Sequence, residues 1–463
     1  MSMTIPDPAS TSLSIDRDAD QTCSDLLHFI DASPTPYHAV ASSAALLGAA
    51  GFTAVSASDD FAALAAGAYY TTVSDGTLLA FVRPRKARAD TIRGFRIVGA
   101  HTDSPNLRIK PRPVYEKVGY LQLGVEVYGG VLLNSWLDRD LRLSGRVMVR
   151  GDDGRLGSRL VSLQQLTMRI PQLAIHLDRE VGEKGLVLNR QEHLAPILGL
   201  ADPKSPRSGG EIQLLHELCA KELGVFTQQI VGLELMLHDS QPATRAGLNQ
   251  ELLLAPRLDN LAMCHAGLSA LLRTFQQDDD SGIVPVVALF DHEEVGSSSD
   301  HGAQSAQLPR LLERLVLSTG GSRESYHQAL SRSLCVSADM AHSVHPNYVD
   351  RHEPNHRPVL NGGPVVKHNS QQRYATSLPT AVAILELGQN AGVAMQEYVH
   401  RTDLPCGSTI GPIVSTLMGI PTVDVGSPML SMHSARELAG AADPEKMTRL
   451  LAHFLLSRNL VGK

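Results

Sequence analysis

Strand-length apolar runs in this sequence end, one after another, at a histidine or an acidic residue. "FRIVGAHTD" ends at His101 and Asp103, and "SLCVSADMAH" places Asp339 directly after its apolar run. "IVPVVALFDHEEVGS" leads to two adjacent glutamates, Glu293 and Glu294. Open α/β sheets bind their ligands beyond the carboxyl ends of the strands. The recurrence therefore predicts an α/β fold in which these side chains gather at one edge of a sheet.

Two further residues extend this group. His433 follows a strand and a loop in "TVDVGSPMLSMHS", and Asp259 in "APRLDN" precedes the helix-like run "LAMCHAGLSALLRTF". Two histidines with several carboxylates and no cysteine suit two divalent cations that share an aspartate. Of two adjacent glutamates, one can bind a cation while the other accepts a proton from water. The spacing does not say which of Glu293 and Glu294 has which role.

Each of these motifs has a simpler interpretation when it is taken alone. A His-x-Asp sequence after a strand is commonly a surface turn. Glu293 and Glu294 can be solvated charges at the start of a helix, where the dipole favours carboxylates. Asp259 can be an N-cap. The joint occurrence of these residues at successive strand ends favours the metal site.

The predicted elements divide the chain into three stretches. Residues 1–109 contain two helices separated by the prolines of "DASPTPYHA", followed by a hairpin at "SDG". Residues 110–249 consist of short alternating strands with turns such as "GDDG" and the loop-like "ADPKSPRSGGE". Residues 250–463 return to alternating strands and helices. Because 463 residues exceed the usual size of one core, we expect an α/β domain, made of the first and third stretches, that a β-rich second stretch interrupts.

Composition makes several classes of partner poor candidates. The chain has 41 basic and 48 acidic residues and no block of like charge, which is unsuited to nucleic acid. It has neither the pattern of a signal peptide nor an apolar run of membrane-spanning length, so we expect a cytoplasmic protein without membrane contact. Its five cysteines are scattered, which argues against disulfides and against a thiolate zinc site. Any metal must then be bound by nitrogen and oxygen.

Eight motifs together resemble the aspartyl aminopeptidase family of metalloaminopeptidases: "TPYHA", "GAHTDSPNLRIKP", "PRLDN", "DHEEVGS", "SADMAHSVHPNY", "GPVVKHNSQQRYAT", "PCGSTIGP" and "GSPMLSMHSARE". The resemblance extends over about residues 34–437. It implies a binuclear zinc exopeptidase with an α/β catalytic domain and a mixed central sheet, interrupted by a β-rich dimerisation domain and assembled as a tetrahedral dodecamer. The implied activity is removal of the N-terminal residue from peptides, with a preference for aspartate and glutamate.

The resemblance also implies which residues bind the metal. His101 and Asp339 are expected to bind one zinc ion, and His433 and Glu294 the other. Asp259 is expected to bridge the two ions. Carboxylate-rich sites also accept manganese or cobalt, so either metal could replace zinc.

Two residues have implied roles next to the metal. Asp103 is expected to orient His101 or a neighbouring ligand, as carboxylates behind metal ligands commonly do. Glu293 is expected to be the general base for a water that the two zinc ions activate.

Three residues are implied in substrate binding and assembly. Lys367 is expected to select acidic side chains, although its spacing alone indicates a surface lysine. His345 matches a histidine near the substrate. His176 matches a histidine that enters the active site of a neighbouring subunit and can stabilise the oxyanion, whereas its pattern alone indicates a buried position on a mostly apolar strand.

Two alternatives stay open at the level of the sequence. The same ligand set could serve a deacylase or an aminopeptidase for neutral or varied residues, because function depends on the specificity pocket rather than on the fold. A non-catalytic assembly protein is a more distant alternative. The presence of Glu293 and of all five expected ligands argues against it, since a protein without activity would be expected to lose these residues first.

Overall fold

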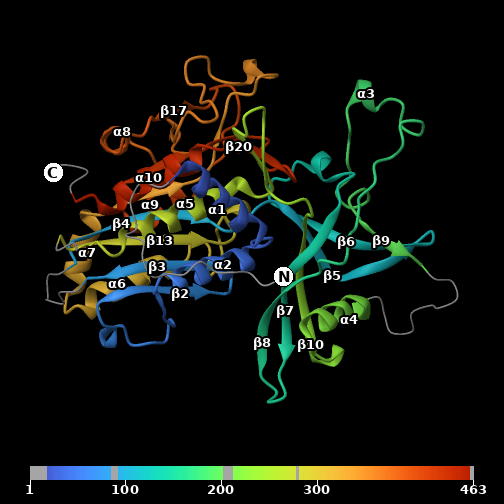
Figure 1. Cartoon of the computed structure of the whole chain (residues 1–463), viewed down its shortest axis with the longest axis horizontal. Coiled ribbons are helices and arrows are strands. Elements are labelled where there is room, and N and C mark those ends of the chain that lie inside the picture. Colours follow the sequence, from blue (N-terminus) through green and yellow to red (C-terminus); the bar gives the residue numbers. More distant parts are fainter. Residues whose placement is uncertain (1–17, 85–91, 202–211, 278–280, 459–463) are drawn as a thin grey trace.

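A mixed nine-stranded sheet is the centre of the computed structural model, which describes residues 18–84, 92–201, 212–277 and 281–458 (Figure 1). Its strands lie in the order β1 (Thr53–Ala54), β2 (Gly67–Val73), β3 (Thr77–Arg83), β13 (Ile283–Phe290), β4 (Gly94–His101), β14 (Leu334–Ala338), β18 (Thr422–Gly426), β16 (Val365–His368) and β17 (Gln396–Val399). The four middle strands, β13, β4, β14 and β18, are parallel to one another. This confirms the predicted α/β class with a mixed central sheet.

Helices cover both faces of this sheet. Alternate strand residues enter two cores, so that Val98 packs on one side and Ile97 on the other, and both are fully buried. The first core is closed by α1 (Ala19–Asp31), α2 (Pro36–Ala49), α5 (Leu258–Thr274), α8 (Leu378–Asn390) and α10 (Asp443–Leu456). The second is closed by α6 (Gln307–Ser318), α7 (Arg323–Ser331) and α9 (Ile410–Met418). Burial on both faces explains why these strands are almost continuously apolar.

Local signals explain where the first elements begin and end. Asp18 caps α1, and Thr35 caps α2 with Pro36 in the first turn, a position that proline favours. The turn between β2 and β3 contains Ser74 and Asp75 in the left-handed region. The predicted helix pair and hairpin are thus confirmed. Among the described helices, none has the length and apolarity needed to cross a membrane.

The middle of the chain forms a separate, antiparallel sheet, on the right of Figure 1. Its strands lie in the order β8 (Leu156–Ser162), β7 (Leu141–Arg150), β10 (Ile230–Asp239), β5 (Asn106–Lys117), β6 (Tyr120–Tyr128) and β9 (Ile197–Leu200). Helix α4 (Ile212–Leu223) packs on it, and the short α3 (Val181–Lys184) lies in the long connection before β9. The β-rich character of this stretch is confirmed. The boundaries at 110 and 249 stay predictions, and most of the predicted loop at 201–211 lies outside the described residues.

A small third sheet positions two of the expected metal ligands, Asp259 and His433. Its five strands lie in the order β11 (Thr244–Ala246), β12 (Leu252–Ala255), β20 (Glu437–Gly440), β19 (Pro428–Leu430) and β15 (Ala341–His342). Strand β12 leads into α5, which carries Asp259, and His433 lies in the turn between β19 and β20. Because β12 pairs with β20, these two segments are adjacent although they are far apart in the sequence.

Candidate metal centre and active site

The carboxyl ends of three neighbouring parallel strands supply most of the site. His101 ends β4 and pairs with Phe290, the last residue of β13, so that the glutamates after β13 lie beside it. Strand β14 flanks β4 on the other side and leads directly to Asp339. The predicted gathering at one sheet edge is present. Three overlapping groups of possible metal ligands form there, and two of them share Asp259.

Asp259 directs one carboxylate oxygen to each histidine. Its Oδ1 lies 3.4 Å from Nε2 of His101, and its Oδ2 lies 3.4 Å from Nε2 of His433. Asp339 completes the first group, with Oδ1 at 3.7 Å from Nε2 of His101. Glu294 completes the second, with Oε1 at 3.4 Å from Nε2 of His433. Ligands around a tetrahedral zinc ion are separated by about 3.3 Å, so both groups are close to the spacing that a cation requires.

The hydrogen bonding of these ligands also fits divalent cations. Nδ1 of His101 lies 2.9 Å from the carbonyl oxygen of Asp103, and Nδ1 of His433 lies 3.0 Å from that of Gly130. A proton on each Nδ1 leaves the Nε2 lone pair facing the carboxylates, as in metal-bound histidines. Asp259 Oδ1 and Glu294 Oε1 are buried and accept no hydrogen bond from any described residue. Such buried oxygens need a positive partner.

The carboxylate of Asp103 holds the backbone of Glu293 and Glu294 in place. It accepts hydrogen bonds from the backbone amides of Glu293 and Glu294, both at 3.1 Å, and from the hydroxyl of Tyr128 at 2.7 Å. The carboxylate is 3.5 Å from Nδ1 of His101, whose nearer partner is the carbonyl of Asp103 itself. Asp103 therefore positions the loop that carries both glutamates as well as the histidine.

Glu437 positions His433 and Asp259, a role that the sequence motifs did not predict. Its Oε1 accepts a hydrogen bond from the backbone amide of His433 at 2.8 Å, and its Oε2 accepts one from that of Asp259 at 3.1 Å. The side chain is buried. One carboxylate thus fixes Asp259 and His433 together. The motif "SMHSARE" contains this glutamate, but nothing in its spacing distinguishes it from a surface charge.

The middle segment of the chain also contacts the site. Tyr128 ends β6, and the glycines that follow it lie against the metal ligands. A Cβ on Gly129 would lie 3.1 Å from Cβ of Glu294, and one on Gly130 would lie 3.2 Å from Nδ1 of His433. The sequence signal was "VYGG" after a strand, which is also typical of an ordinary turn.

Burial makes three glutamates at this site strong proton acceptors. It raises the pKa of Glu293 to about 8, although His101 opposes the shift. Burial also raises the pKa of Glu294 well above its ordinary value, and it raises the pKa of Glu437 to about 8. A divalent cation bound beside these groups would compete with their protons.

Lys367 is buried beside Asp339, so the surface position that its spacing indicated is wrong. Its Nζ donates to the carbonyl oxygens of Asp339 at 2.9 Å and Met340 at 3.1 Å, and it lies 3.7 Å from Oδ2 of Asp339. The ring of Tyr374 lies 5.1 Å from this ammonium. Pairing with carbonyls and a carboxylate compensates the burial of the charge.

His345 lies partly buried in the loop after β15. Its Nδ1 accepts a hydrogen bond from the backbone amide of Asn347 at 3.2 Å, and its own amide donates to Nε2 of His352 at 3.0 Å. Because Nδ1 accepts, the neutral ring carries its proton on Nε2 and can donate it to another group.

His176 is not buried on a strand, contrary to the interpretation of its pattern. It lies in an exposed turn of the middle segment, where Leu177 donates to the carbonyl of Ala174. Its neighbours Ile175 and Leu177 are 57% and 74% exposed. The apolar pattern that suggested a strand therefore belongs to surface side chains. Among the described residues, His176 belongs to none of the groups of possible metal ligands.

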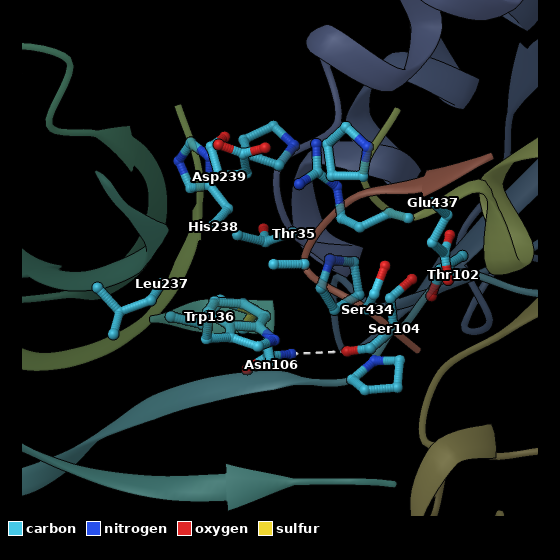
Figure 2. A pocket seen from close by; sticks show the side chains of 17 residues that line it. Thr35, Thr102, Ser104, Asn106, Trp136, Leu237, His238, Asp239, Ser434 and Glu437 are labelled. Carbon is cyan, nitrogen blue, oxygen red and sulfur yellow. Dashed lines mark hydrogen bonds between the residues drawn. The ribbon is translucent and has the colours of Figure 1, made fainter. Parts of the chain in front are cut away.

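A cavity of about 20 Å³ lies between the middle segment and chain neighbours of the expected ligands, such as Thr102 and Ser434 (Figure 2). Its lining includes Trp136, His238, Thr35 and Glu437. This volume accommodates about one water molecule rather than a peptide. Substrate must therefore approach the ligands from another direction.

Comparison with known proteins identifies the family. The family model described as aminopeptidase I zinc metalloprotease (M18) matches residues 29–455. The chain belongs to the M18 family. It is accordingly a metal-dependent aminopeptidase, a hydrolase, and zinc is the metal that the family description names. The resemblance recognised in the eight motifs is confirmed.

Curated relatives of this M18 aminopeptidase match it almost from end to end. A probable M18 family aminopeptidase 2 of Streptomyces coelicolor is 47% identical over 93% of this chain and 96% of the relative. A protein with the same description from Pseudomonas paraeruginosa is 46% identical over 94% of this chain and 98% of its own.

Solved structures share the fold of this M18 aminopeptidase. A cryo-EM structure of the Ape4 and Nbr1 complex matches with a TM-score of 0.91 and 38% identity, over 96% of this chain and 88% of that one. The mApe1 dodecamer of S. cerevesiae matches with a TM-score of 0.82 and 28% identity, over 96% and 98% of the two chains.

Proposed function

We propose that this M18 aminopeptidase removes the N-terminal residue from peptides at a site for two divalent cations, with zinc as the metal and Glu293 as the general base. The observation that carries the proposal is the position of Asp259, which directs one oxygen to His101 and the other to His433. Cations on both sides of Asp259 supply, when bound, the Lewis acidity that polarises a peptide carbonyl and acidifies water. Asp339 and Glu294 complete the two ligand sets.

Glu293 is the residue left for proton transfer. A carboxylate oxygen of Glu293 lies within 4.8 Å of ligand atoms of His101 and Glu294, yet Glu293 belongs to neither group that contains Asp259. It can therefore accept a proton from the attacking water as the carbon–oxygen bond forms. It then returns that proton to the departing amine as the carbon–nitrogen bond breaks. The hydrogen bond from its backbone amide to Asp103 fixes its position.

Lys367 supports a preference for acidic N-terminal residues. It is a buried cation next to Asp339, and two of its three N–H groups donate to backbone carbonyls. A substrate carboxylate could take the place of the distant contact with Asp339 Oδ2 at 3.7 Å. We propose that His345 donates from Nε2 to the same end of the substrate.

We propose that the active chain is a homo-oligomer, a tetrahedral dodecamer, in which His176 of one subunit enters the site of the next. The support is the exposure of His176 together with the apolar side chains of Leu173, Ile175 and Leu177, which would bury surface on assembly. The similar S. cerevesiae structure is described as a dodecamer.

The alternative within this chemistry is an aminopeptidase for neutral or varied residues, or a deacylase. Lys367 already contacts protein groups, so it could serve only to hold the segment of Asp339 in place. Substrate selectivity distinguishes the two roles of Lys367, because a purely structural lysine would affect all substrates alike.

The test compares initial rates on aspartyl, glutamyl and leucyl amides for the wild type and Lys367→Met. We expect the wild type to favour the acidic substrates. The variant should lose about tenfold or more in kcat/KM for aspartyl over leucyl amides, because one buried charge contact contributes at least 1.4 kcal/mol. Lys446→Met is the matched control, since Lys446 also donates to a backbone carbonyl, that of Asn361. An equal loss of kcat/KM on all three substrates would mean that Lys367 has only a structural role.

A further inference from the structure

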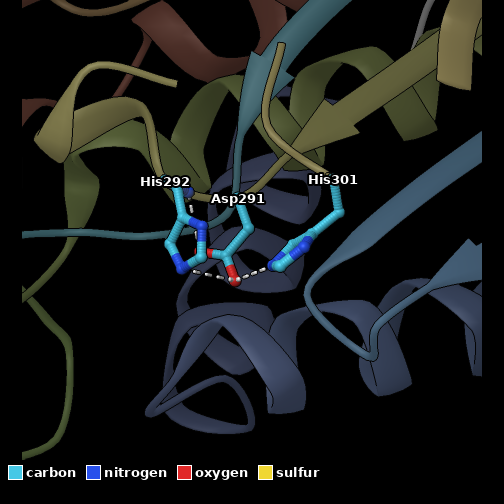
Figure 3. A group of neighbouring side chains, drawn as sticks. All are labelled: Asp291, His292 and His301. Atoms are coloured by element: carbon cyan, nitrogen blue, oxygen red, sulfur yellow. Dashed lines mark hydrogen bonds and ion pairs between the residues drawn. The ribbon is translucent and has the colours of Figure 1, made fainter. Parts of the chain in front are cut away.

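A second cluster of possible ligands lies just beyond β13 and is separate from the groups that share Asp259. It consists of Asp291, His292 and His301, each of which offers one atom within 4.8 Å of the others. Figure 3 shows both imidazole rings directed at the carboxylate of Asp291. Oδ2 of Asp291 lies 3.9 Å from Nε2 of His292 and 3.7 Å from Nε2 of His301.

The carboxylate of Asp291 lacks a full set of partners. The side chain is fully buried, and Oδ1 accepts a hydrogen bond from the amide of His292 at 2.8 Å. Oδ2 accepts no hydrogen bond from the described residues. Gly76 closes the other side, because a Cβ there would lie 2.1 Å from Oδ2. A buried anionic oxygen without a donor is costly, so this position calls for a positive group.

The tautomers of the two histidines strengthen this argument. Nδ1 of His301 lies 2.5 Å from a carboxylate oxygen of Asp300, which can only accept when ionised, so Nδ1 carries the proton. Nδ1 of His292 lies 2.9 Å from the hydroxyl of Ser299. When the Ser299 hydroxyl accepts from His292, both Nδ1 atoms donate and two Nε2 lone pairs face the same carboxylate oxygen. Three electron-rich atoms repel one another unless a cation or a proton lies between them, and this arrangement is the usual one behind metal-bound histidines.

We propose that Asp291, His292 and His301 bind one more divalent transition-metal cation, of the zinc type, in addition to those of the Asp259 site. Two imidazoles and a carboxylate are ligands that zinc and cobalt accept. The nitrogen–oxygen separations of 3.7 and 3.9 Å need to shorten by only about half an ångström to surround a tetrahedral ion. The side chain of His292 is 22% exposed, so solvent and the ion can reach the cluster.

The cation would connect three parts of the structure. Asp291 directly follows β13 and precedes Glu293, His301 lies in the loop before α6, and Gly76 belongs to the turn between β2 and β3. The ring of His292 also lies 6.4 Å from that of Tyr128, which donates to Asp103. The role of this cation is structural, because it holds the segment from which Glu293 projects.

The competing explanation is a proton in place of the cation. A protonated His301 would pair with Asp291, whose contact raises the pKa of that histidine. If a proton is present instead, replacing either histidine leaves the metal content per chain unchanged. Measuring the metal content therefore distinguishes the proton from the cation.

The experiment measures metal per chain after equilibrium dialysis of the full-length protein against micromolar zinc chloride. We expect His301→Gln and His292→Asn each to contain one equivalent less than the wild type. His327→Gln, which alters an exposed histidine elsewhere, should keep the wild-type count. In cobalt-loaded protein, the wild type minus His301→Gln should give the visible absorption of one coordinated Co²⁺. This readout does not depend on activity.

Two results would overturn the proposal. One is equal metal content in the wild type and both variants, with each variant shown to be folded by its circular dichroism. The other is a cobalt difference spectrum without a visible band. Either would leave the cluster with a proton as its positive group.

Discussion

Gly130 and His433 are 303 positions apart in the chain, and the carbonyl oxygen of Gly130 lies 3.0 Å from Nδ1 of His433. The middle segment therefore completes the site of its own chain by fixing the tautomer of a ligand. Gly130→Ala should place a Cβ 3.2 Å from this nitrogen and turn the ring away from Asp259. We expect affinity for one cation to fall about 10- to 100-fold, as for other changes behind metal ligands. Competition with a chelator measures this affinity.

Gly157→Ala is the matched control for that variant. Gly157 lies in β8 of the same sheet, and nothing lies within 4 Å of an added Cβ. It should bind metal as the wild type does. An unchanged affinity in Gly130→Ala would show that the contact between Gly130 and His433 does not matter to the metal.

Glu293→Gln should retain the cations of the Asp259 site and lose turnover by about a hundredfold or more, because a general base contributes about that factor. Glu294→Gln should lose metal, since Glu294 Oε1 faces His433. Metal analysis and kcat on the same preparations measure both effects. Normal turnover in Glu293→Gln would refute its role as the base.

The metal-free protein should become less stable as the pH rises from about 4.5 to about 8. Burial raises the pKa of Glu437 from 4.5 to about 8, so the folded state binds this proton more tightly than the unfolded state within that window. Deprotonation then costs the folded state on the order of a few kcal/mol. Urea unfolding in a chelator at pH 5.5 and 8.5 measures the loss. Glu437→Gln should show a smaller loss, and an identical loss in both proteins would contradict the shift.

His176→Phe should reduce kcat without lowering the metal content. The side chain is exposed and lies among apolar neighbours, so the substitution should not destabilise the subunit. Light scattering would verify that the oligomer is retained. Unchanged kinetics in an intact oligomer would remove the case for a shared active site.

The strand ends could be predicted because burial on both faces leaves long apolar runs, and the first polar residue after each run marks the sheet edge. His101, Asp339 and the two glutamates were found in this way. Glu437 and Gly130 could not be, because their roles depend on strand pairing and on contacts between segments hundreds of residues apart. The pattern around His176 alone indicated a buried strand, because an apolar pattern does not distinguish a core strand from an apolar surface turn. The spacing of Lys367 alone indicated a surface position, because general exposure statistics do not anticipate a buried lysine paired with carbonyls.

The dependence of cleavage on metal is tested most directly by the initial rate on an aspartyl amide. This rate is measured before chelation, after chelation and after zinc is restored. We expect cleavage to disappear with the metal and to return with zinc, because in the proposed mechanism Asp259 and its partners hold the catalytic cations. Cleavage that continues at the same rate in protein shown to contain no metal would contradict it.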